Sequence, residues 1–219
     1  MNMKNFAFRL AGNFGRCFAP HFLPFHLLAI ISTYYFATTG FDWWIYSTGR
    51  ANIPFTLVMI AGFGGFLVPV LLPAVFYGIG YFAKEAKMRM IAFALAHAGI
   101  LGVLLSWFYK AFTGRAHPDL WSYVSLTDVT HQFQFGFLKG GVLWGWPSSH
   151  TTVAFAMAIT LALLYKKNNA IRVPVLLWAC FVGFGASVGF HWPSDVLAGV
   201  IFGTIVGMVV AKSYITSTR

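Results

Sequence analysis

Long apolar segments separated by short polar stretches dominate the chain. Each of six such segments is about as long as the roughly 20 helical residues that a hydrocarbon core requires. Two prolines, Pro69 and Pro73, are expected to kink the second segment, where neighbouring helices can satisfy the freed backbone groups. The pattern predicts an all-α, polytopic membrane protein with six transmembrane helices, at about residues 22–39, 55–81, 89–109, 149–166, 171–190 and 194–213.

The organisation predicted around these segments is a short cytoplasmic or interfacial N-terminal segment and one membrane domain. Residues 1–17 place three basic side chains among phenylalanines, which is typical of an interfacial helix or of the basic flank of a first span. A cleaved signal peptide is less consistent with the long apolar run that follows. Residues 18–219 then form a single six-span domain. Its longest loop, about 110–147, is the expected active-site loop, because long loops in compact chains are usually functional.

Composition supports the membrane assignment and excludes one class of partner. The 219 residues are 58% hydrophobic and only 9% charged, whereas soluble domains have about 25% charged residues. The formal net charge is +10, but no basic run is interleaved with aromatic residues outside an apolar segment. We therefore expect a lipid bilayer around the protein and no nucleic-acid partner.

The basic residues predict the orientation of the spans. With the N-terminus in the cytoplasm, four of the 15 lysines and arginines fall on the outer side, which leaves eleven on the inner side. Both termini are then cytoplasmic, and the long loop faces the periplasm or the extracellular space. The expected location is a bacterial inner membrane or a plasma membrane. The four outer residues are Arg50, Lys110, Arg115 and Lys139.

A histidine and a carboxylate stand four residues apart near the end of the chain. If a helix starts here, His191 and Asp195 lie on the same face. An aspartate that binds one ring nitrogen fixes the tautomer and raises the basicity of the other nitrogen. The pair suits a nucleophile or a general base, although two helix ends could also be joined by such a pair for structural reasons alone.

The turn that opens the fourth predicted span has the character of an anion site. Proline at the first helical position, here Pro147, is pre-organised for a helix. The following N–H groups and the hydroxyls of Ser148 and Ser149 lie at the positive end of the helix dipole, where a phosphate binds well. His150 stands beside them and can donate a proton. The same residues could act as a simple N-cap.

Two histidines beside a phosphate site predict a division of labour. His191, oriented by Asp195, attacks phosphorus and forms a phosphohistidine, while His150 protonates the leaving group and then activates water. Lys110 and Arg115 add positive charge that stabilises the equatorial oxygens, although Arg115 could instead anchor a lipid headgroup. Neither a metal nor another cofactor is required.

These residues form three motifs that resemble those of the type 2 phosphatidic acid phosphatase (PAP2) superfamily. The resemblance covers about residues 50–213 and implies a six-span helical bundle, metal-independent lipid phosphatase activity and an outward-facing site. The motifs are Lys110-(six residues)-His117-Pro118, Pro147-Ser148-Ser149-His150 and His191-(three residues)-Asp195.

Each motif departs from the family pattern. The first ends in His117 where the family has arginine, and Arg115 stands two residues earlier. The second has Ser149 in place of glycine, and the third has Phe184 and Gly185 in place of Ser-Arg. We expect His117, as imidazolium, and Arg115 to substitute for the absent arginines. The phosphate-binding set expected from the sequence is Lys110, Arg115, His117, Ser148 and Ser149, and the catalytic set is His191, His150 and Asp195.

The function predicted from the sequence is that of a lipid phosphate or diphosphate phosphatase at the outer membrane face. Candidate substrates are undecaprenyl diphosphate, phosphatidylglycerol phosphate, phosphatidate and a lipid A phosphate. A phosphotransferase would use the same phosphohistidine. A catalytically degenerate protein that binds phospholipid without turning it over is the alternative that the absent arginines favour.

Overall fold

The computed structural model describes residues 3–118 and 127–216, and in these ranges the regular structure is helical apart from one isolated β-bridge between Arg115 and Phe133. The predicted all-α class is therefore confirmed. Residues 119–126 of the expected active-site loop lie outside the described ranges. The helices are α1 (Met3–Arg16), the short 3₁₀ turn η1 (Pro20–Phe22), α2 (Leu23–Thr38), α3 (Phe41–Asn52), α4 (Phe55–Phe82), α5 (Ala86–Thr113), α6 (Ser149–Leu164), α7 (Asn169–Gly189) and α8 (Pro193–Ile215).

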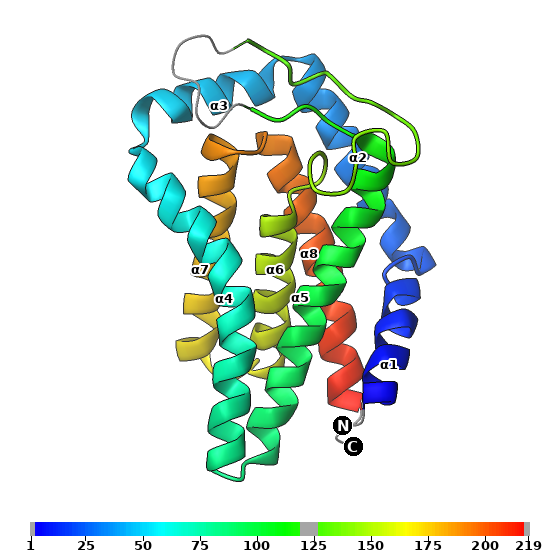
Figure 1. Cartoon of the computed structure of the whole chain (residues 1–219), viewed down its shortest axis with the longest axis vertical. Helices are drawn as coiled ribbons and strands as arrows, with labels where there is room; N and C mark the ends of the chain where they lie inside the picture. Colours follow the sequence, from blue (N-terminus) through cyan, green and yellow to red (C-terminus); the bar gives the residue numbers. More distant parts are fainter. Residues whose placement is uncertain (1–2, 119–126, 217–219) are drawn as a thin grey trace.

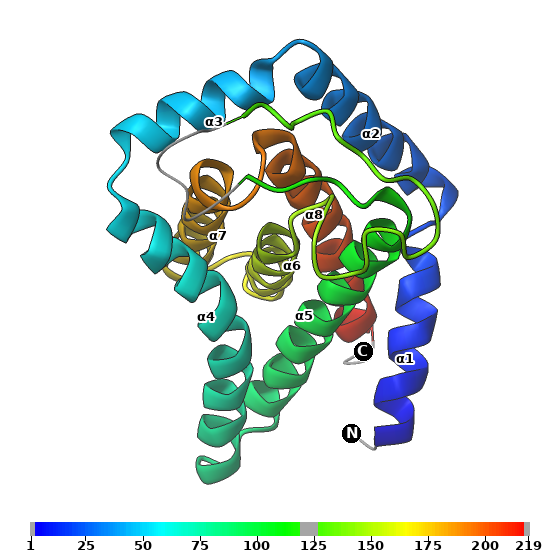
Figure 2. The ribbon, with the colours of Figure 1, turned by 45° about the horizontal axis from the view of Figure 1, so that its top comes forward.

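Five helices, α4 to α8, run along the long axis of the molecule, and α1 and α2 lie beside α5 and α8 (Figure 1). Helix α1 begins and helix α8 ends in the lower part of this view. The loop between α5 and α6 and the short helix α3 cover the opposite end (Figure 2). The segments that the sequence assigns to the two sides of the membrane are therefore separated along this axis.

Each of the six predicted apolar segments corresponds to a helix, but six membrane spans are not confirmed. Four helices, α4, α5, α7 and α8, have the length and hydropathy of a span, and α1 with α2 would make a fifth if the pair, bent by 56°, crosses as one unit. Helix α6 has 16 residues, or about 24 Å, which is short for a core of about 30 Å. The structure is that of a multi-pass membrane protein with four or five candidate spans.

Helix α6 lies inside the bundle, against α5, α7 and α8. Small residues on α8 allow this approach: Gly199, Gly203 and Gly207 recur every four residues on the face that meets α6. A Cβ atom on Gly203 would lie 2.5 Å from the carbonyl oxygen of Thr152, and one on Gly207 would lie 2.6 Å from Cβ of Ile159. Small residues at this spacing let two membrane helices pack backbone to backbone.

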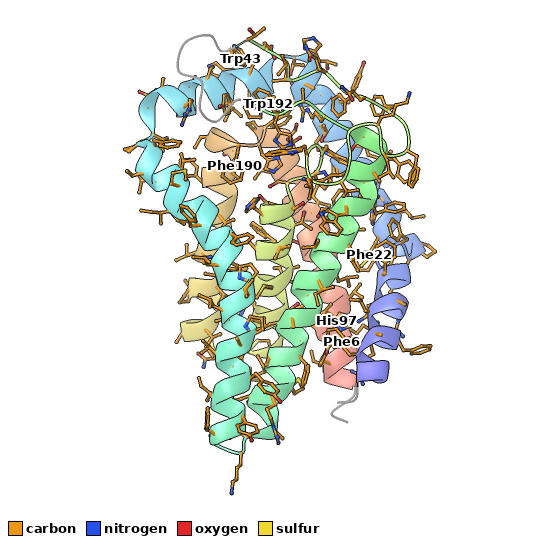
Figure 3. The ribbon with its side chains drawn as sticks, viewed as in Figure 1. Phe6, Phe22, Trp43, His97, Phe190 and Trp192 are labelled. Carbon is orange, nitrogen blue, oxygen red and sulfur yellow. The ribbon has the colours of Figure 1, made fainter. Side chains whose placement is uncertain are left out.

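The hydrophobic pattern did not predict helix α3. Its 12 residues mix aromatic and polar side chains and are too few to span a bilayer. Gly40, with φ of 76°, precedes it in the left-handed conformation that glycine adopts readily. Tyr46 of α3 is buried against Trp192, with ring centroids 5.0 Å apart, and Trp43 lies near the same indole (Figure 3). Helix α3 thus covers the beginning of α8.

The glycine stripe of α8 gives a direct test of the packing. We expect Gly203→Ala to lower stability by about 1–3 kcal/mol, the usual cost of overpacking a close contact, because the new methyl would overlap the backbone of α6. The midpoint of thermal unfolding in detergent measures the effect. Gly78→Ala is the matched control, since a Cβ atom there has no neighbour within 4 Å. Equal midpoints for the two variants would contradict the packing argument.

Candidate active site

The structure brings His191 and Asp195 together at the start of α8. The helix begins at Pro193 with Trp192 as N-cap, so His191 precedes the helix and does not lie on its first turn. One oxygen of Asp195, Oδ2, accepts the backbone N–H of Trp192 at 3.2 Å and lies 3.3 Å from Nδ1 of His191. The pairing therefore comes from the cap geometry and not from the helical spacing that the sequence suggested.

The environment of His191 defines its protonation state. Because the carboxylate of Asp195 accepts a hydrogen bond, Nδ1 of His191 carries the proton and Nε2 keeps its lone pair. Burial lowers the pKa of His191 well below its ordinary value; the hydrogen bond to Asp195 opposes this, and the positive charge of Lys110 adds to the lowering. At neutral pH the imidazole is neutral, with one nitrogen available as a nucleophile.

The start of α6 faces this histidine. Ser148 is the N-cap, and its hydroxyl accepts the N–H three residues further on at 3.4 Å. Pro147 thus precedes the cap, and its expected place at the first helical position is wrong. The hydroxyl oxygen of Ser149 is buried without a hydrogen-bond partner among the described residues. The ring of His150 lies 6.5 Å from that of His191, centroid to centroid.

Lys110 supplies the positive charge next to this histidine. It lies in the last turn of α5 and is 1% exposed. Its Nζ donates one described hydrogen bond, to the carbonyl oxygen of Leu143 at 3.0 Å. An ammonium has three donors, so two remain for an anion. The positive charge of Lys110 acts on His191 and disfavours protonation of its ring.

His117 uses both ring nitrogens within the protein. Its Nδ1 lies 2.8 Å from the carbonyl oxygen of Phe190 and its Nε2 accepts the N–H of Gly145 at 2.6 Å. Since a carbonyl can only accept, Nδ1 carries the proton and the ring is neutral, and burial lowers its pKa accordingly. This arrangement ties the loop to the α7–α8 turn and leaves no ring N–H of His117 for a phosphate oxygen.

Arg115 also directs its donors to groups within the protein, and it is only 2% exposed. Nη1 donates to Oδ1 of Asp195 at 2.5 Å and to the hydroxyl of Ser194 at 2.8 Å. Nη2 donates to Oδ2 of Asp42 at 2.7 Å, and Nε and Nη2 both donate to the carbonyl oxygen of Thr130. These five bonds use all five donors of a guanidinium. In this state Arg115 can neither bind phosphate nor anchor an exposed headgroup.

At position 185, where the family has its other arginine, the neighbouring helix leaves no room for a longer side chain. A Cβ atom on Gly185 of α7 would overlap Cβ of Ala61 in α4. Gly65, one turn further along α4, comes close to the ring of His150: a Cβ atom there would lie 3.3 Å from Cδ2. Phe184 points away, with 48% of its surface exposed. Helix α4 therefore fills the space that a longer side chain at position 185 would need.

Sequence reasoning missed three members of this cluster: Asp42, Thr130 and Ser194. The signal for Asp42 was weak but present, because it is one of only five acidic residues in the chain and stands among aromatic side chains. Its side chain is completely buried. Thr130 contributes through its backbone carbonyl and Ser194 through a short hydroxyl, so neither has a recognisable sequence pattern.

Comparison with known families now identifies the chain. The sequence model of the PAP2 superfamily matches residues 88–219, which is more than half of the chain. The protein belongs to the PAP2 superfamily. The match begins in α5 and includes every residue of the three motifs, but it excludes α1 to α4 and with them Asp42.

Curated relatives agree with this assignment. The chain is 29% identical over 170 residues to a lipid A 1-phosphatase of Rhizobium etli, covering 71% of this chain and 69% of the relative. It is 32% identical over 123 residues to the lipid A 1-phosphatase of Rhizobium johnstonii, with coverage of 54% and 44%. A third relative, the undecaprenyl-diphosphatase BcrC of Bacillus subtilis, is 38% identical over 64 residues, with coverage of 29% and 32%. No solved structure matches significantly.

The two hydrogen bonds that the neutral ring of His117 makes within the protein predict a pH dependence of stability. Its folded pKa lies below the ordinary value of about 6.5, so the unfolded chain binds this proton first as pH falls. The stability that the neutral ring contributes is complete above about pH 6.5 and is lost progressively below it. We expect the thermal midpoint to fall on acidification and to fall less steeply in His117→Gln. Parallel pH curves for the two proteins would contradict this.

Proposed function

We propose that this PAP2 protein is a metal-independent lipid phosphate or diphosphate phosphatase that acts through a phosphohistidine at the outer membrane face. The observation that carries the proposal is the arrangement of His191: its Nδ1 is held by Asp195, and its Nε2 keeps the lone pair. Around it stand the ring of His150, the amine of Lys110 and the N-terminus of α6. The names of the three relatives support the same reaction class.

The proposed chemistry proceeds in two balanced steps. Nε2 of His191 forms a bond to phosphorus while the P–O bond to the lipid breaks, and protonated His150 gives its proton to the leaving oxygen. The phosphorylated imidazole is cationic, and Asp195 stabilises it. Water then attacks phosphorus, His150 accepts its proton, and the P–N bond breaks to release phosphate.

The phosphate in this proposal is held without the two arginines that the family pattern provides. Lys110 contributes a buried charge with unused donors, and the first N–H groups of α6 point outward at the positive end of its dipole. The buried hydroxyl of Ser149, which has no described partner, is a further donor for a phosphate oxygen. Charge stabilisation by such pre-organised donors is a main source of catalysis in phosphoryl transfer.

An apolar recess supports a lipid as the substrate. It has a volume of about 510 Å³ and lies between α2, the end of α5 and the loop. Ile30, Tyr34 and Ala37 line one wall, and Tyr109 and Trp146 line the other. The last two immediately precede Lys110 and Pro147 in the chain, so the recess adjoins the proposed phosphate site. We propose that it receives part of the lipid tail.

Two alternatives use the same residues. A phosphotransferase would pass the phosphoryl group from His191 to a second lipid instead of water. A degenerate phospholipid-binding protein would bind without turnover, and the complete internal engagement of Arg115 and His117 favours this alternative. Retention of His191, His150 and Asp195 in one site favours an enzyme.

The principal test measures phosphate release by purified protein in detergent with a chelator present. Lipid A, undecaprenyl diphosphate, phosphatidylglycerol phosphate and phosphatidate are offered in turn. We expect release from at least one of them, and a loss on the order of 10⁴-fold in His191→Gln, because the nucleophile is gone. A radiolabelled phosphate should be trapped on the wild type as an acid-labile adduct.

The control for this test is His21→Gln, which replaces an exposed histidine in the turn η1 between α1 and α2. No phosphate release from any lipid, with wild type equal to His191→Gln, would refute the enzyme proposal. Activity that disappears with the chelator would refute the metal-independent mechanism. Label transferred to a second lipid instead of water would identify the phosphotransferase.

The recess predicts a dependence on chain length. Ala37→Phe should fill part of the volume and lower kcat/KM for a long-chain substrate by about tenfold, the scale of losing one or two buried methylene contacts. A short-chain substrate with the same headgroup should be hydrolysed at the wild-type rate. Equal losses for both chain lengths would mean that the recess does not receive the tail.

A further inference from the structure

Three buried charged side chains from distant parts of the sequence meet at the start of α8. Asp42 comes from α3, Arg115 from the segment after α5, and Asp195 from α8, and their side chains are 0% to 1% exposed. The guanidinium lies between the two carboxylates, with ion-pair distances of 2.7 Å to Asp42 and 2.5 Å to Asp195. Trp43 follows Asp42 in the chain, and the backbone N–H of Trp192 binds Asp195. These two tryptophans therefore mark the place of the cluster in Figure 3.

Asp42 also holds the first turn of α8. Its Oδ1 accepts the backbone N–H of Ser194 at 2.8 Å, and its Oδ2 accepts the Ser194 hydroxyl at 2.6 Å. The hydroxyl of Ser194 in turn accepts a hydrogen bond from Arg115 at 2.8 Å. Helix termini leave N–H groups unsatisfied, and a carboxylate near them interacts favourably with the dipole. Asp42 therefore acts as a cap supplied by another helix.

We propose that Asp42 and Arg115 are positioning residues that orient the carboxylate of Asp195 toward Nδ1 of His191. Arg115 binds Oδ1 of Asp195, so that Oδ2 faces the imidazole and the N–H of Trp192. Asp42 fixes the guanidinium from its other side. The inference rests on the phosphatase activity proposed above, and it extends the site to α3, which lies outside the part that matches the family.

Burial of this cluster would be costly if it served stability alone. Removing ions from water carries a large desolvation penalty, which an ion pair recovers only with good geometry and additional hydrogen bonds. Here one guanidinium faces two carboxylates, so the cluster carries a net negative charge. That charge suits a site whose imidazole becomes cationic when it is phosphorylated. Geometry and charge together indicate a function in orienting His191.

The two residues should affect His191 in opposite directions. Arg115 partly neutralises the negative charge of Asp195, and Asp42 partly neutralises the positive charge of Arg115. Without Arg115, the full negative charge of Asp195 would stabilise the protonated imidazole of His191. Without the negative charge of Asp42, Arg115 would neutralise Asp195 more strongly, and the protonated imidazole would be less stable. The titratable or charged groups facing His191 from the surrounding elements are Asp195 of α8, Lys110 of α5, His150 of α6 and His117 of the loop.

The test compares Asp42→Asn and Arg115→Gln in the detergent assay described above. The controls are Glu85→Gln and Lys167→Gln, which remove exposed charges. We expect kcat to fall about 10- to 100-fold in both test variants, the scale of losing an orienting partner, with KM nearly unchanged. The acid limb of the kcat/KM profile should move to higher pH in Arg115→Gln and to lower pH in Asp42→Asn. Impaired folding alone would not produce opposite shifts.

A second measurement does not depend on turnover. Nitrogen-15 NMR of histidine-labelled protein, with the His191 signals assigned by their absence in His191→Gln, should show Nδ1 protonated and Nε2 bare in the wild type. Arg115→Gln should shift the titration of His191 to higher pH, and Asp42→Asn should shift it to lower pH. If the wild type hydrolysed no lipid phosphate, the proposed function would fail, and these spectra would still decide the positioning role.

Specific outcomes would overturn the inference. A tenfold rise in KM for Arg115→Gln with unchanged kcat would mean that Arg115 binds phosphate directly. Acid limbs and NMR titrations identical to those of the control variants would mean that the cluster has a structural role only. If Arg115→Gln does not fold, Arg115→Lys replaces it. Lysine keeps the positive charge but lacks the planar group with five fixed donors, so kcat should fall while the acid limb stays in place.

Discussion

The guanidinium of Arg115 joins three segments of the chain at one point. Its five donors bind the loop at Thr130, helix α3 at Asp42 and helix α8 at Ser194 and Asp195. A fully used guanidinium has a single geometry, because each donor direction is fixed by the planar group. One side chain therefore contacts the loop, the covering helix and the turn that carries His191, and it adds to the direct hydrogen bonds between them.

This constraint explains how the site differs from the family pattern. Arg115 lies two residues before the position where the family has an arginine, and it turns inward to the carboxylates instead of toward a phosphate. His117, at that position, clamps two backbone groups as a neutral ring. Helix α4 fills the space at Gly185. Positive charge for a substrate is thus concentrated in Lys110 and in the N-terminus of α6.

Packing in the bundle and geometry in the site depend on each other. The glycines of α8 bring that helix against α6, and the same approach places the N–H of Ser148 3.0 Å from the carbonyl oxygen of Asp195. The N-cap of one helix is thereby fixed to the first turn of the other, and His150 and His191 follow from these two helix starts. A change in helix spacing would move both histidines, because interiors packed at this density transmit displacement.

The sequence by itself determined the helical class, the apolar segments and the three motifs, because these depend on composition and on spacing within short stretches. It also placed His191 beside Asp195, although for a reason that the cap geometry corrected. Only the tertiary structure decided the number of candidate spans, the inward orientation of Arg115 and the participation of Asp42. The physical reason is that an ion pair between residues 73 positions apart leaves no local pattern. The short helix α3 lacks the length of a membrane span, and its position is set by what it covers.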